Sequence, residues 1–224
     1  MLLLIQNIFD QLAQISAYLW YLPILAGAWQ WRRLDTTFRL YVMGSVCSVF
    51  LVTVLAQLQL RNVAYYCMPL LGSVIFGMIF QNLLNHIVQP KLIAGLSVLI
   101  WIVVWLYIIT YGIQEFQLRS TIPYDVIMMA LSGIYITDRL RNSSHINEPL
   151  FYLVLVLLID FCINLFIDVM SNFLTAYFSD NFMDLLWDKI IPAYNLIKII
   201  CLIAILFSVK PKLPSLDRMP EFEH

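Results

Sequence analysis

An aspartate and a lysine, Asp160 and Lys198, lie near the midpoints of two successive hydrophobic segments, residues 149–172 and 187–209. Each is about eleven residues, or roughly 16 Å of helix, from the ends of its segment. A charge at the centre of a bilayer costs about 2.5–3.5 kcal/mol on insertion scales, so such residues usually face the interior of a helical bundle and mark function. Consecutive spans run antiparallel, so we expect the two side chains to meet at one depth.

Two stripes of polar residues run from these charges toward the same end of the two helices. The first has a spacing of four residues, which puts its members on one helical face, and consists of Asp160, Asn164, Asp168 and Asn172. The second lies on roughly one face of the next helix and consists of Asp184, Asp188, Asn195 and Lys198. Pro192 removes a helical hydrogen bond and can kink this helix beside the charges. Asp125 is expected near the outer end of the fifth predicted helix, residues 122–138.

These stripes predict a polar cleft among the last three helices, open to the outside and closed by the Asp160–Lys198 pair. The candidate binding or coupling residues are Asp160, Lys198, Asn164, Asp168, Asn195, Asp188 and Asp125. Because acids are expected at its mouth, the cleft should favour cations or a basic ligand group. The alternative interpretation is a structural ion pair with hydrogen bonds that fix the register of the helices.

The composition is that of a polytopic membrane protein. Of the 224 residues, 62% are hydrophobic and 12% are charged, whereas soluble domains carry about 25% charged residues. Because the charges fall between long apolar segments, we predict an all-α transmembrane bundle over residues 1–209 and a short cytoplasmic tail over 210–224. The seven predicted spans are about 11–31, 36–60, 62–86, 91–112, 122–138, 149–172 and 183–209.

The distribution of Lys and Arg predicts the orientation of the bundle. With the N-terminus outside and the C-terminus cytoplasmic, the basic residues on the inner side are Arg32, Arg33, Arg39, Lys91, Arg139, Arg141, Lys210, Lys212 and Arg218. Those on the outer side are Arg61, Arg119 and Lys189. The basic inner loops also offer a docking surface for a cytoplasmic protein partner.

Several classes of function have no support in the sequence. The net charge of −1 does not favour a nucleic-acid partner. The four cysteines, Cys47, Cys67, Cys162 and Cys201, are far apart and lack metal or redox spacing. No zinc-protease, serine-nucleophile or phosphate-loop motif is present. We therefore predict no metal and no cofactor, and we favour a protein that is not an enzyme.

Residues 21–41, YLPILAGAWQWRRLDTTFRLY, combine an aromatic residue and a proline, a glycine, and a basic turn that leads into the second helix. Further features are Gly112 before an outer loop, Pro149 and Phe151 at the start of the sixth helix, and Trp187 and Asn195 in the seventh. In this pattern the chain resembles an uncharacterised family of small seven-helix integral membrane proteins of bacteroidete-type bacteria. The resemblance implies the fold and the bacterial inner (cytoplasmic) membrane, and it implies no specific activity.

Three functions fit these observations. The first is a non-enzymatic membrane module, a sensor or partner subunit, that takes a ligand in the outer cleft. The second is a small transporter or channel that uses the mid-membrane charged pair, for which Pro192 resembles the broken helices of transporters. The third is a lipid-active enzyme with Asp160 and Asp168 as acid and base, but eight residues separate these carboxyl groups by about 12 Å. A retinal protein is disfavoured because the third predicted span has no acidic counter-ion.

Overall fold

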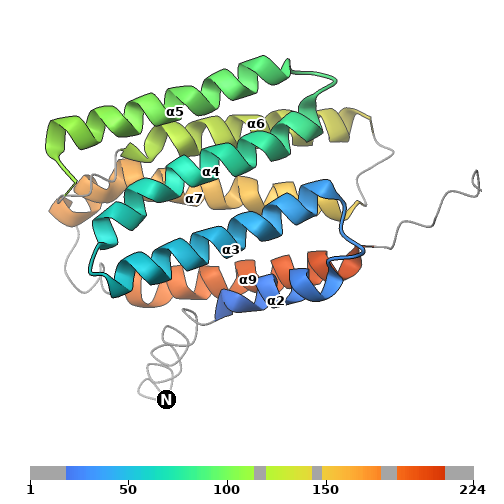
Figure 1. The fold of residues 1–224 in the computed structure, drawn as a ribbon, viewed down its shortest axis with the longest axis horizontal. Helices are drawn as coiled ribbons and strands as arrows, with labels where there is room; N and C mark the ends of the chain where they lie inside the picture. The colour runs from blue at the N-terminus through green and yellow to red at the C-terminus, as the bar shows by residue number, and fades with distance from the viewer. Residues whose placement is uncertain (1–18, 114–119, 143–147, 178–185, 210–224) are drawn as a thin grey trace, which may run out of the picture.

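The computed structural model describes residues 19–113, 120–142, 148–177 and 186–209, and every regular element in these ranges is helical. The elements are α2 (Tyr21–Gln30), α3 (Thr36–Gln57), α4 (Arg61–Leu84), α5 (Pro90–Tyr111), α6 (Ile122–Arg141), α7 (Pro149–Tyr177), the π-helix η2 (Leu186–Ile190) and α9 (Ile191–Ser208). The α-helices lie side by side as one bundle (Figure 1). The predicted all-α class is confirmed for the described part of the chain.

Five of these helices are long and apolar enough to cross a membrane, which makes the chain a multi-pass membrane protein. The five spans lie in α3, α4, α5, α7 and α9. The other two predicted spans differ from them. Of the first, residues 11–18 fall outside the described residues, and the described helix α2 covers only Tyr21–Gln30, ten residues. Helix α6 has twenty residues but carries Asp125, Asp138 and two arginines, so it is the most polar of the long helices.

Six of the helices form a closed ring. Around the ring, α2 packs on α3, α3 on α4, α4 on α6, α6 on α7, α7 on α9, and α9 returns to α2. Close approach within the ring depends on glycine, because a Cβ atom on Gly44 of α3 would lie 2.7 Å from the Ile75 side chain of α4. The six helices follow one another around the ring in their order along the chain, and of the described α-helices only α5 is left out.

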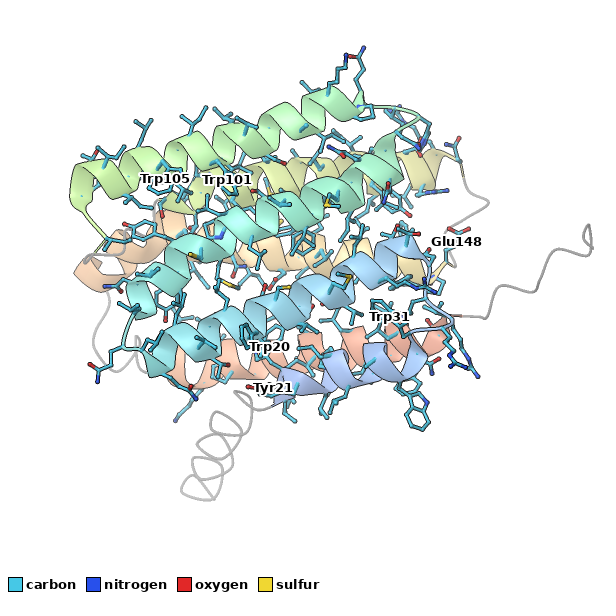
Figure 2. All side chains as sticks on the ribbon, in the orientation of Figure 1. Trp20, Tyr21, Trp31, Trp101, Trp105 and Glu148 are labelled. Atoms are coloured by element: carbon cyan, nitrogen blue, oxygen red, sulfur yellow. The ribbon has the colours of Figure 1, made fainter. Side chains whose placement is uncertain are left out.

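Helix α5 lies outside the ring, at the edge of the bundle, against α4 and α6 (Figure 1). A small polar cluster fixes it to α4. The Trp101 indole donates a hydrogen bond of 3.0 Å to Ser73 Oγ, and the Ser97 hydroxyl donates one of 3.0 Å to the Ser73 carbonyl. Trp101 and Trp105 both lie along this helix (Figure 2), and both are exposed on the periphery of the bundle.

The basic side chains gather at one end of the bundle, which we call the basic end. It comprises the turn after α2, the first turns of α3 and α5, and the last turn of α6, with Arg32, Arg33, Arg39, Lys91, Arg139 and Arg141. At the opposite end, which we call the far end, the described residues include Arg61 at the start of α4 and Lys189 in η2. Trp31 and Glu148 lie at the basic end (Figure 2).

Two predicted helix boundaries are wrong. Helix α7 continues to Tyr177, beyond the predicted end at residue 172. The last span is not one α-helix, because the π-helix η2 precedes α9. Pro192 lies in the first turn of α9, where a missing backbone N–H costs nothing since it has no partner within the helix. The expected kink inside the last helix is replaced by this change of helix type.

Candidate functional site

A cavity of about 670 Å³ lies inside the six-helix ring, and all six helices contribute to its wall. Its lining runs from Tyr41 and Leu202, which lie in the halves of α3 and α9 nearer the basic end, to Thr53 and Tyr65 near the far end. Toward the basic end it is closed by packed core residues, among them Phe38, Leu84, Val154 and Leu206, all of them buried. The cavity therefore extends from the far end of the bundle to beyond its middle, and no residue of α5 lines it.

The central charged group of this cavity is the Asp160–Lys198 pair. Lys198 Nζ lies 2.5 Å from Asp160 Oδ1, so the predicted contact is present. The Tyr194 hydroxyl donates a second hydrogen bond of 2.9 Å to the same oxygen. The side chains of Lys198 and Asp160 are only 10% and 18% exposed, so water can screen the pair only weakly.

Aromatic rings surround the ammonium group of Lys198. Its Nζ lies 4.6 Å from the ring centroid of Trp20 and 5.4 Å from that of Tyr194. Both distances are within the range of a cation–π interaction. Trp20 lies just before α2, and Figure 2 shows it beside α9, so this one cation connects α2, α7 and α9.

A second polar group lies about two helical turns farther along α7. Asp168 accepts a hydrogen bond from the Thr121 hydroxyl, and its carboxyl group is within hydrogen-bonding reach of that of Asp125 in the first turn of α6. A hydrogen bond between two carboxyl groups requires a proton on one of them. Both aspartates are buried, with 2% of Asp125 and 8% of Asp168 exposed. Asp160 and Asp168 thus belong to separate groups on the cavity wall.

The remaining predicted residues divide into three cases. Asn164 lines the cavity between the two acidic groups. Asn195 lies on α9 but is not part of the lining. Asp188 lies in η2, although its side chain, like Asp184 and the side chain of Asn172, is outside the described residues.

The prediction that only the last three helices form the cleft is wrong, because α2, α3 and α4 form the other half of the wall. The sequence did not identify Tyr194 as a hydrogen-bond donor to Asp160. It also did not identify four of the lining residues, Trp20, Tyr41, Thr121 and Tyr124. Tyr194 and Lys198 are four residues apart and therefore lie on one helical face, so the sequence did contain a signal that both could reach Asp160. No such signal exists for Trp20, which reaches the site from the other end of the chain.

Comparison with known proteins adds no family or relative, since no protein-family model, curated protein or solved structure matches the chain.

Proposed function

We propose that this protein is a non-enzymatic integral membrane module, a sensor or partner subunit, that binds a small ligand in the cavity inside the six-helix ring. The observation that carries the proposal is the cavity itself: about 670 Å³ inside the ring, with a charged pair on its wall and a packed core beneath it. Ligand sites in helical bundles are typically of this kind, apolar with a few convergent polar groups.

The chemistry of the site favours binding over catalysis. The Asp160 carboxylate is already neutralised by Lys198 and bound by Tyr194, so the pair holds helices in register. The second carboxyl group on α7, Asp168, is about 12 Å away along the helix. Two carboxyl groups that far apart cannot act jointly on one bond of a lipid substrate.

We place the protein in the bacterial inner membrane, with seven spans and the cavity opening to the outside. This orientation follows from the positive-inside rule, which puts the basic end in the cytoplasm. A ligand in the cavity would contact α2, α3 and α4 as well as α6, α7 and α9. A shift of these helices could then be passed to a cytoplasmic protein at the basic end.

Cysteine accessibility tests this proposal. On a background without the four native cysteines, Ser48→Cys places a thiol on the cavity wall, and Ser132→Cys places one in the packed core as the matched control. We expect a membrane-impermeant methanethiosulfonate reagent added outside intact cells to modify position 48 and to leave position 132 unmodified. Resistance of position 48 to the outside reagent would contradict an outward-opening cavity.

A small transporter is the second candidate, and one observation favours it. The π-helix η2 directly precedes α9, which carries Lys198 near the middle of its span. Interrupted helices beside mid-membrane charges are typical of transporter binding sites. A transporter must open the cavity to both sides in turn, so Ser48→Cys would also react with reagent presented from the cytoplasmic side of inverted vesicles. A sensor that keeps its inner core closed would show reaction from outside only.

A further inference from the structure

A second hollow lies on the outer surface of α6, apart from the central cavity. It has a volume of about 430 Å³ and is lined by Ile87 after α4 and by Ala130, Gly133, Ile134, Thr137, Asp138 and Arg141 of α6. The α6 residues lie three or four positions apart, so they form one stripe along the helix. We call this hollow the α6 groove.

The groove is apolar in its middle and open to the surroundings of the bundle. Ile87 and Ile134 are 45% and 40% exposed, although both are large hydrophobic residues. A Cβ atom built on Gly133 would meet no atom within 4 Å, so no described side chain fills the space above this glycine. In a multi-pass membrane protein, an exposed apolar groove along a helix faces lipid acyl chains.

The groove ends in charge at the basic end of the bundle. Asp138 is already engaged, with its Oδ2 atom 3.1 Å from His86 Nε2 and its Oδ1 atom accepting a hydrogen bond of 3.0 Å from Asn142. Among the described residues no carboxylate lies within salt-bridge distance of Arg141, which is exposed. The groove therefore presents, at the end of an apolar trough, a guanidinium group that has no acidic partner among the described residues.

We propose that the α6 groove binds an anionic phospholipid, with one acyl chain over Ala130 and Gly133 and the phosphate at Arg141. Guanidinium groups bind phosphate oxygens in bidentate geometry, and basic pockets between spanning helices bind anionic headgroups on the cytoplasmic side. Gly133 and Arg141 are eight residues, or about 12 Å, apart along the helix. This length fits a phosphate at the interface and an acyl chain directed toward the middle of the membrane.

Charge complementarity favours a lipid over a second copy of this chain as the occupant. The basic end carries Arg32, Arg33, Arg39, Lys91 and Arg139 in addition to Arg141. A second copy placed against the groove in a symmetric dimer would bring two such basic ends to the same depth, where they would repel each other. An anionic headgroup instead neutralises Arg141 where it lies.

Native mass spectrometry of the full chain in detergent tests the proposal, with phosphatidylglycerol and phosphatidylcholine of identical acyl chains as the probes. We expect phosphatidylglycerol to bind the parent at least ten-fold more tightly than phosphatidylcholine. Arg141→Gln should reduce this preference to about two-fold or less, while Arg33→Gln, an exposed arginine at the same end, should leave it unchanged. Gly133→Leu should weaken binding of both lipids by filling the trough.

Gly95→Leu on α5 is the matched control for Gly133→Leu, because a Cβ atom there also meets nothing within 4 Å. Ala130→Phe is a second way to fill the groove if Gly133→Leu does not fold. Equal binding of the two lipids by the parent would overturn the proposal, as would equal losses in Arg141→Gln and Arg33→Gln. A dimer that Gly133→Leu dissociates, with no lipid preference, would assign the groove to a second copy of the chain instead.

Discussion

Removing one partner of the Asp160–Lys198 pair should destabilise the bundle strongly, whereas removing both should not. In Lys198→Met the Asp160 carboxylate keeps the Tyr194 hydroxyl as its remaining donor among the described residues. In Asp160→Asn the ammonium keeps the faces of Trp20 and Tyr194. Each single variant therefore leaves one uncompensated charge on a side chain that is largely buried.

The burial of the Asp160–Lys198 pair determines how much stability each single variant loses. The side chains are only 10% and 18% exposed, and loss of one partner of a buried pair costs about 3–5 kcal/mol. We expect Lys198→Met to cost this amount and Asp160→Asn to cost less, because the amide oxygen can still accept from Tyr194. The double variant has no buried charge, so its cost should be lower than the sum of the singles by about 2 kcal/mol or more.

The assay is a double-mutant cycle of reversible unfolding in mixed detergent and sodium dodecyl sulfate micelles. Tyr194→Phe is the control, because it removes one hydrogen bond to a charged group, worth about 1.5–3 kcal/mol, and keeps both charges. If the losses of unfolding free energy in the two single variants add up to the loss in the double variant within about 0.5 kcal/mol, the reasoning is refuted. Such a result would mean that water or another group compensates each charge independently.

Three further predictions concern packing and topology. Gly44→Ala should lower the free energy of unfolding by about 1–3 kcal/mol, since its Cβ atom would lie 2.7 Å from the Ile75 side chain. The control, Gly95→Ala, has open space around its Cβ atom and should not destabilise the protein. Equal effects of the two substitutions would contradict the close approach of α3 to α4. Trp101→Phe should cost about 1 kcal/mol more than Trp105→Phe, because the Trp101 indole donates a hydrogen bond to a serine of α4; thermal unfolding of the two variants decides. Cysteines added at the two termini should be labelled from opposite sides of intact cells, as an odd number of spans requires, and labelling of both from one side would rule out seven spans.

The amino-acid sequence determined the helical class, the membrane environment and the meeting of Asp160 with Lys198. These features depend on local pattern: apolar segments of span length, basic residues between them, and two charges at equal depth in antiparallel neighbours. Helices α7 and α9 are consecutive spans and pack on each other. The contact between their mid-span charges therefore needed no knowledge of the other helices.

The shape of the cavity was decided only by the tertiary structure. Helix α5 lies outside the ring and α2 closes it against α9, so Trp20, just before α2, reaches a site on α9. Apolar helices in a bilayer gain little from hydrophobic burial against one another, and their neighbours are chosen by close packing and hydrogen bonds. That choice rests here on contacts such as Gly44 with Ile75 and Trp101 with Ser73, which no spacing within one segment reveals.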